Sequence, residues 1–299
     1  SFSVSDLIDS PRVKTLEWKH DDEIEEDVSS RVFSLFGRAI HQILEWGAED
    51  GQIAEERLFL TIEVDGVTTT ISGAMDLQDI GFGEAPLTME GDVWTEDGPV
   101  KIRDWKATTV WAYQADKPQW PNQLNMYAHL VRNAQFSERM VNGKRVRTKH
   151  QRRGVQDLAI GAILRDWSAA KAKNQPSYPQ APIQTLDLPL WSVQAAEKYF
   201  IDRVRMHVKA RAQEFAGVEL PQCTTEERWQ EEKTYAVLKD GGKRALAVYD
   251  TKAEAMSHIN DVKANLILEE RGGTPKRCVD WCKVSAFCSQ YQKELKEKK

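Results

Sequence analysis

The sequence has no long hydrophobic run, and this absence sets its first limit. No stretch of the 299 residues approaches the roughly 18 consecutive apolar residues that a membrane-spanning helix needs. The first residues, SFSVSDLIDSPRVK, also lack the basic and then apolar pattern of a secretory signal. We therefore expect a cytoplasmic protein with no membrane partner.

Internal repeats, low-complexity segments and the P-loop motif G-x-x-x-x-G-K-[ST] are absent as well. Hydrophobic residues make up 41% of the chain and charged residues 29%, which is ordinary for a globular protein and too apolar for a disordered one. A chain of this length buries one large core, or one core with a small appendage.

An excess of positive charge is also missing. The formal net charge is -5 and the pI is near 5.8, so bulk electrostatics give no support to nucleic-acid binding. The local exception is KRVRTKHQRR over residues 144–153. This run either contacts phosphate groups or forms a solvated loop between a helix and a strand. Its candidate contact residues are Lys144, Arg145, Arg147, Arg152 and Arg153.

Hydrophobic periodicity predicts a helix and three antiparallel strands in the first part of the chain. Residues 29–50 carry an apolar stripe at helical spacing. From residue 57 the period changes to two, which predicts a hairpin with its turn at Asp65-Gly66 and a second strand ending near Ile80. A loop over 81–99, which contains at most a short strand at LTMEGDVW, precedes the strand PVKIRDWKA.

The pattern continues with a helix that Pro121 opens, the buried strand LAIGAILRDWS and a long helix over 192–215. TYAVLKDGGKRALAVYDT then predicts a hairpin, followed by the helix KAEAMSHINDVKANLI. We expect an α/β protein with a core over 1–222 and a second region over 223–299, which contains a ββα insertion at about 229–268.

Three residues on the predicted strands form an acidic constellation. Asp104 and Lys106 are two apart on one strand, so their side chains leave the same face. Asp76 comes from the neighbouring strand in GAMDLQDI. Two carboxylates suit a hard cation that polarises a phosphoryl oxygen, and the lysine suits charge developing on phosphate. The alternative is an ordinary solvent face, because D-x-K often occurs by chance.

Four successive motifs resemble the RecB-like branch of the PD-(D/E)XK nuclease superfamily. They are GRAIHQILE with its histidine, GAMD as G-x-x-D, RDWK as D-x-K, and QLNMY as Q-x-x-x-Y. The motifs occur in the family's order and fall on the expected helix, strand, strand and helix, over roughly residues 30–167. The resemblance implies a restriction-endonuclease-like core, with a central mixed sheet flanked by helices.

The resemblance also implies roles for single residues. His41, Asp76, Asp104 and the carbonyl of Trp105 would bind Mg²⁺ or Mn²⁺, and Lys106 would be the catalytic lysine. Gln123 and Tyr127 share one helix face and would point to the site, although a tyrosine here also suits the core. Glu63 is a further ligand candidate, and a solvent-facing glutamate is the simpler interpretation.

Cysteine is scarce, but three of the four cysteines are bunched near the C-terminus. Cys278, Cys282 and Cys288 suit ligands around one metal centre, and Cys223 supplies a fourth thiolate. The tail resembles that of iron-sulfur RecB-like nucleases such as the AddB type, which hold a [4Fe-4S] cluster. In those relatives the lone cysteine precedes the nuclease motifs, whereas Cys223 follows them. Zinc, or four buried thiols without a metal, are the alternatives.

The function that the resemblance implies is a metal-dependent DNA exonuclease in recombination, repair or phage DNA processing. Its expected partners are DNA ends or single strands, with a recombinase, an annealing protein or a separate helicase. A structure-specific endonuclease or nickase would share the same site, and a non-catalytic DNA-binding scaffold would share the fold. Trp111, Tyr113 and Trp120 either stack on bases or pack against the protein.

Overall fold

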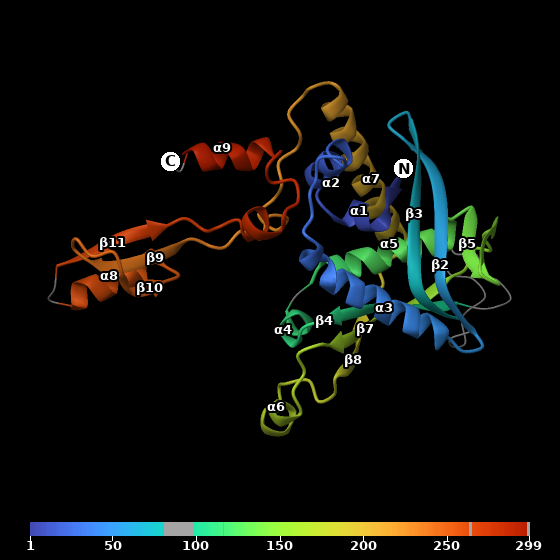
Figure 1. Cartoon of the computed structure of the whole chain (residues 1–299), viewed down its shortest axis with the longest axis horizontal. Helices are drawn as coiled ribbons and strands as arrows, with labels where there is room; N and C mark the ends of the chain where they lie inside the picture. The colour runs from blue at the N-terminus through green and yellow to red at the C-terminus, as the bar shows by residue number, and fades with distance from the viewer. Residues whose placement is uncertain (81–98, 116, 263–264, 298–299) are drawn as a thin grey trace. The chain divides into compact units, whose positions relative to one another are not determined.

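A computed structural model of the chain describes residues 1–80, 99–115, 117–262 and 265–297 (Figure 1). The chain divides into two compact units. Unit 1 comprises Ser1–Pro11 and Glu25–Val218, and unit 2 comprises Arg12–Ile24 and Glu219–Lys299. The predicted division at 222/223 did not anticipate that Arg12–Ile24 belongs with the C-terminal part.

Unit 1 is a mixed α/β unit built on an eight-stranded sheet, with the order β6-β5-β2-β3-β4-β7-β8 and β1 paired to β3. The β4–β7 and β1–β3 pairs are parallel and the others antiparallel. The strands are β1 (Phe2–Ser3), β2 (Gln52–Val64), β3 (Val67–Ile80), β4 (Val100–Thr108), β5 (Phe136–Val141), β6 (Lys144–Lys149), β7 (Val155–Leu164) and β8 (Ile183–Leu188).

Helices of unit 1 flank this sheet, and α5 and α7 pack against each other (Figure 1). A Cβ atom on Gly73 of β3 would lie 2.8 Å from both the Tyr127 ring and Leu130, so only glycine lets α5 approach the sheet this closely. The helical segments are α1 (Val4–Ile8), η1 (Val28–Arg31), α3 (Val32–Trp46), α4 (Val110–Gln114), α5 (Gln119–Asn133), α6 (Ala169–Asn174) and α7 (Val193–Phe215).

The predicted β2–β3 hairpin is confirmed. Asp65 and Gly66 have φ values of 52° and 77°, which is the pair of left-handed conformations that a two-residue type I′ turn requires. The predicted strand PVKIRDWKA corresponds to β4, and the Pro121 helix corresponds to α5, which begins at Gln119. The short strand considered at LTMEGDVW lies outside the described residues.

The basic run is not the loop that we considered. Lys144–Lys149 form β6, which pairs with β5 in an antiparallel hairpin. Asn142 and Gly143 make its turn with φ values of 49° and 74°. Asn-Gly between two strands is a strong hairpin signal, and the density of basic residues masked it in the sequence.

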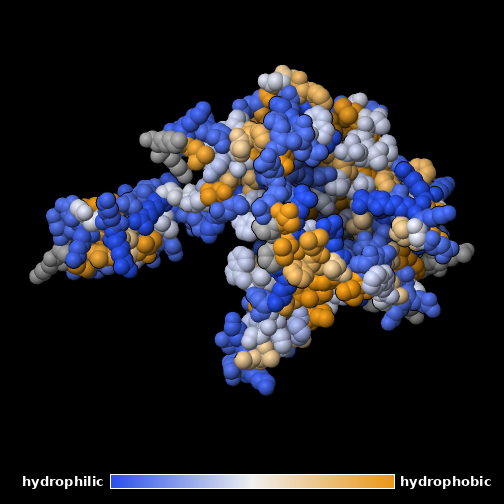
Figure 2. All heavy atoms as spheres, viewed as in Figure 1, coloured by the Kyte–Doolittle hydropathy of each residue, from blue (hydrophilic) through white to orange (hydrophobic). Residues whose placement is uncertain are grey.

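The first helix is confirmed as α3, but none of its apolar side chains that the structure describes is buried. Leu35, Phe36, Ile43 and Trp46 are all more than half exposed. Figure 2 shows hydrophobic residues gathered over this helix. Helical periodicity identifies an apolar stripe but not the surface that receives it, so the sequence could not have predicted this exposure.

Unit 2 contains a three-stranded antiparallel sheet with the order β10-β9-β11, and α8 packs on it. The predicted hairpin is β9–β10, but the following helix stops at Asp261 and a third strand, β11, replaces its predicted end. The elements are α2 (Pro11–Lys19), β9 (Thr234–Lys239), β10 (Ala245–Tyr249), α8 (Lys252–Asp261), β11 (Leu266–Arg271), η2 (Arg277–Trp281) and α9 (Ser289–Glu297). Neither unit has a described helix that is long and apolar enough to cross a bilayer.

Candidate active site and cysteine cavity

The candidate site lies where β3 and β4 part. Their ladder runs from the pair Ile80–Val100 to the pair Leu77–Arg103 and ends there. In an antiparallel ladder the next opposed residues would be Asp76 and Asp104. Beyond that point β4 continues its pairing with β7 alone. The two predicted aspartates are therefore the first residues past the opening of the sheet.

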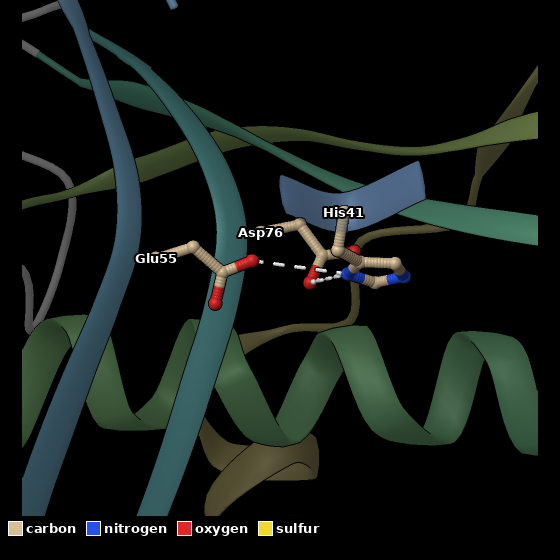
Figure 3. Close-up of side chains that lie close together, drawn as sticks. All are labelled: His41, Glu55 and Asp76. Carbon is tan, nitrogen blue, oxygen red and sulfur yellow. Dashed lines mark ion pairs between the residues drawn. The ribbon is translucent and has the colours of Figure 1, made fainter. Parts of the chain in front are cut away.

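Asp76 belongs to a cluster of three potential metal ligands (Figure 3). The Nδ1 atom of His41, on α3, lies 3.1 Å from Asp76 Oδ1 and 3.8 Å from Glu55 Oε1 on β2. One ligand atom from each residue lies within 4.8 Å of the other two. This cluster offers two carboxylates and one imidazole, which suit Mg²⁺ or Mn²⁺.

Asp104 is not part of that close group. Its side chain is 3% exposed and its Oδ2 atom lies 2.6 Å from Lys106 Nζ. Lys106 Nζ also donates to Gln123 Oε1 at 3.1 Å, and Gln123 Nε2 donates to Tyr127 OH at 2.9 Å. A polar chain of four residues thus runs from the sheet opening into α5 and joins the predicted D-x-K and Q-x-x-x-Y motifs.

Electrostatics link the two groups of side chains. Hydrogen bonding to Asp76, and then to Glu55, raises the pKa of His41 to about 10. Burial raises the pKa of Asp104 to about 6, although Lys106 acts against that rise, and the charge of Asp76 adds to it. Burial likewise raises the pKa of Tyr127, to which the charge of Asp104 contributes. Asp104 therefore lies close enough to Asp76 to respond to its charge.

Trp105 takes part through its backbone. Its N–H donates to Asp76 Oδ2 at 2.7 Å. A residue in a strand directs its N–H and C=O groups to the same side, so the Trp105 carbonyl points to the Asp76 side of β4. The indole packs over Gly161 of β7, where a Cβ atom would lie 2.3 Å from the ring. The indole therefore packs closely against the backbone of β7, the strand that pairs with β4.

Glu55 is a candidate metal ligand that the sequence analysis missed. Glu63, which we considered on the same strand, is exposed and pairs with Thr68. Glu55 stands across from Asp76, between the pairs Ala54–Leu77 and Glu56–Met75. The signal was available, because a turn at Asp65-Gly66 fixes the register of the whole hairpin.

The basic residues predicted to contact DNA differ in their exposure to solvent. Lys144, Arg145, Arg147 and Arg152 are exposed. Arg153 is 4% exposed and pairs with the buried Glu56 at 3.2 Å, so its guanidinium is occupied inside the protein. We therefore correct the prediction of Arg153 as a DNA contact.

The three aromatic candidates between β4 and α5 also differ. Tyr113 and Trp120 pack against the hydrophobic core of unit 1, which supports a packing role for both. Trp111 is 73% exposed, with Lys117 Nζ 5.0 Å from its ring centre. Of these three side chains, Trp111 alone offers a free surface to a base.

All four cysteines of unit 2 line one cavity, and none forms a disulfide. Cys288 is buried, while the other three are partly buried. Burial raises the pKa of Cys282. Among the described residues, no three cysteine sulfurs lie within 4.8 Å of one another. The cavity also receives Val284, Tyr291 and the side chains of Arg12 and Arg228.

Arg12 is a buried cation beside the cysteines. It is 1% exposed, and its Nε donates to Cys288 Sγ at 3.2 Å. Its other nitrogens donate to Leu220 O at 2.8 Å and to Glu219 Oε1 at 3.2 Å. Arg228 lies beside Cys278 and pairs with Glu294. Two guanidinium groups therefore face a set of four sulfur atoms.

Comparison with known proteins adds little. No protein-family model and no curated protein matches the chain. Among solved structures, the crystal structure of SSO0001 aligns with a TM-score of 0.40 and 15% identity, over 68% of this chain and 74% of that chain. A likeness at this level supports no conclusion about family or activity, so function has to be argued from the residues.

Proposed function

We propose that the protein is a metal-dependent DNA exonuclease with a PD-(D/E)XK site of the RecB-like branch on a restriction-endonuclease-like core. The observation that carries this proposal is the opening of the β3–β4 ladder. Asp76 and Asp104 flank that opening, His41 reaches Asp76, and Lys106 joins Asp104 to Gln123. These residues come from four motifs scattered over the sequence.

The donor set fits Mg²⁺ or Mn²⁺. Carboxylate oxygens of Asp76, Glu55 and Asp104, the imidazole of His41 and the carbonyl of Trp105 would hold the ion. A bound ion of this kind supplies Lewis-acid polarisation of phosphate and a more acidic water. Since the pKa of His41 is about 10 without a metal, its imidazole would release a proton when it becomes a ligand.

The chain's own residues then have separate tasks. Lys106 presents a compact cation at the site, where it would stabilise charge on a phosphate oxygen. Asp104 and Gln123 hold its ammonium from two sides, at 2.6 and 3.1 Å. Tyr127 accepts a hydrogen bond from Gln123 and packs against Gly73, which anchors this arrangement to α5.

We also propose that the cysteine cavity holds a four-thiolate metal centre, with [4Fe-4S] preferred over zinc. The observation that supports a metal centre is that all four cysteines line one cavity and none forms a disulfide. The preference for iron-sulfur rests on the resemblance of the cysteine tail to that of iron-sulfur RecB-like nucleases, since four thiolates would also suit zinc. A colourless protein that releases zinc would refute the iron-sulfur preference.

End-labelled linear DNA, single-stranded DNA and covalently closed circles, each with Mg²⁺ or Mn²⁺, test the nuclease proposal. We expect degradation of the substrates with ends and no cutting of the circles. Asp104→Ala and Lys106→Ala should each lower cleavage at least about a hundredfold. Lys101→Ala, on the same strand but paired with Asp187 at the surface, is the matched control. Full cleavage by either site variant would refute the assignment.

A further inference from the structure

One face of the β2–β3 hairpin continues outward from the candidate site. On β3 the side chains alternate without interruption, so Asp76, Ser72 and Thr70 share this face. Arg57, Phe59 and Thr61 of β2 lie on it as well, whereas Glu55 has a left-handed φ of 49° that interrupts the alternation of β2. Arg57 Nη1 lies 3.3 Å from Ser72 Oγ, and Thr61 Oγ1 lies 2.9 Å from Thr70 Oγ1. These contacts join the two strands on one face, which β3 carries outward along the hairpin from Asp76 of the metal-ligand cluster.

The β5–β6 hairpin extends this face sideways. Phe136 and Glu138 of β5 stand opposite Phe59 and Arg57, and β6 adds its own alternate residues. The guanidinium of Arg147 lies 4.3 Å from the ring centre of Phe59 and 4.9 Å from that of Phe136. We call the resulting surface the outer strip, which comprises Arg57, Phe59, Phe136, Glu138, Met140, Arg145, Arg147 and Lys149.

The outer strip is accessible and positively charged. Phe136 is 45% exposed and Met140 54% exposed, and the basic residues of β6 are exposed. Four cations stand against one carboxylate, Glu138, which pairs with Arg145 at 3.6 Å. The opposite face of the β2–β3 hairpin carries Gly73, and α5 covers that face. An acidic chain of net charge -5 thus keeps a basic, partly aromatic surface beside its candidate site.

We propose that the outer strip binds single-stranded DNA and leads its end to the candidate site, an inference that rests on the proposed function. Exposed rings and guanidinium planes bind the faces of unpaired bases, which a duplex keeps stacked inside itself. The cations neutralise phosphates along the same path. Phe59 is four residues from Glu55, or about 13 Å along the strand, so the contacts fall a few nucleotides from the site.

The test measures binding without cleavage. A fluorescent oligodeoxythymidine and a fluorescent blunt-ended duplex are titrated with the full chain in EDTA. We expect Phe136→Ala and Arg147→Ala each to weaken oligodeoxythymidine binding at least about fivefold, as the loss of one stacking contact does. Arg147→Ala should also reduce the salt dependence by about 0.7 in slope, as for one phosphate contact on a single strand.

Three further variants keep the test specific. Phe136→Tyr preserves the ring and should bind normally, whereas Phe136→Leu keeps an apolar side chain without the ring and should bind weakly. Arg205→Ala removes one cation from α7, where Arg205 pairs with Asp65 and Asp202, and should leave binding unchanged. Circular dichroism of each variant checks that the fold persists.

Unchanged oligodeoxythymidine affinity in both alanine variants would overturn the proposal that the outer strip binds single-stranded DNA. An equal loss of duplex binding would overturn it as well. Because EDTA removes the metal, this result is independent of the nuclease assay. Normal metal-dependent cleavage with unchanged binding would refute the strip and leave the proposed function standing. Weakened binding in a protein that cuts no DNA would support the strip and refute the nuclease.

Discussion

The candidate active site of unit 1 and the cysteine cavity of unit 2 are built in opposite ways. The strands of a large sheet and the helices that flank it position the active-site residues. Hydrogen bonds link several of these side chains to one another or to the backbone. The cysteines lie on segments with little regular structure, apart from the short η2 turn that carries Cys278. We therefore expect the active-site residues of unit 1 to keep their positions when metal is removed, and the C-terminal part of unit 2 to depend on the four-thiolate centre proposed above.

Loss of a cysteine should have the largest effect, and the two units should respond differently to it. Cys282→Ser removes one thiolate, and the binding energy of a structural metal is also folding energy, about 10 kcal/mol or more for zinc-binding peptides. We expect the cysteine segment to lose its metal and its protection from hydrogen exchange, while β2, β3 and α5 keep theirs. Elemental analysis and hydrogen exchange measure both. Equal loss of protection in the two units would contradict the inference.

Arg12→Ala should have the next largest effect, because each buried acceptor that loses its donor costs about 1–3 kcal/mol. Leu220 O and Cys288 Sγ would lose their donor. A four-thiolate zinc or oxidised [4Fe-4S] centre would carry a net charge of about minus two, which Arg12 and Arg228 would partly balance. We expect faster metal release to a chelator, which Arg12→Lys should restore only in part. Release at the normal rate from Arg12→Ala would argue against this role.

Low pH should reduce the stability of the core of unit 1. Burial lowers the pKa of both His129 and His207 to about 4, below the ordinary value of 6.5. The unfolded chain therefore binds more protons between these values, and the stability present above pH 6.5 is lost as the pH falls toward 4. Each histidine contributes up to about 3 kcal/mol to this loss.

Urea unfolding at pH 7.5 and pH 5, followed by hydrogen exchange in α5 and α7, measures the acid effect. His207→Gln removes one titrating group and should reduce the difference between the two pH values, even if it lowers stability at both. A pH dependence identical to that of the unaltered chain would show that His207 does not titrate on unfolding.

The two regions also differ in what the sequence could reveal. In unit 1 the turn at Asp65-Gly66 fixes a register that places Glu55 opposite Asp76 and Glu63 opposite Thr68. Asn142-Gly143 likewise marks the β5–β6 hairpin. Both follow from turn chemistry and strand geometry. The missed ligand candidate Glu55 and the missed β5–β6 hairpin were therefore predictable from local signals.

Other features had no local signal. Arg12 lies more than 200 residues from the cysteines that it faces, and its own neighbours, Pro11 and Val13, indicate only a helix. The burial of Arg153 depends on Glu56, which comes from a distant strand. A single sequence records neither contact, because charged residues are normally exposed and only the tertiary structure brings these partners together.

The smallest expected effect is a gain in the stability of unit 1. It tests whether the buried negative charge of Asp104 destabilises the fold. Asp104 is buried beside Asp76, and its pKa of about 6 exceeds the ordinary 3.8, so the fold loses stability as the carboxyl ionises between these values. Asp104→Asn keeps the shape and removes the charge. Without metal at pH 7.5, it should stabilise unit 1 by about 1–3 kcal/mol and abolish cleavage. A lower melting temperature than that of the unaltered chain would mean that the pairing of Lys106 with Asp104 outweighs the cost of burying the carboxylate.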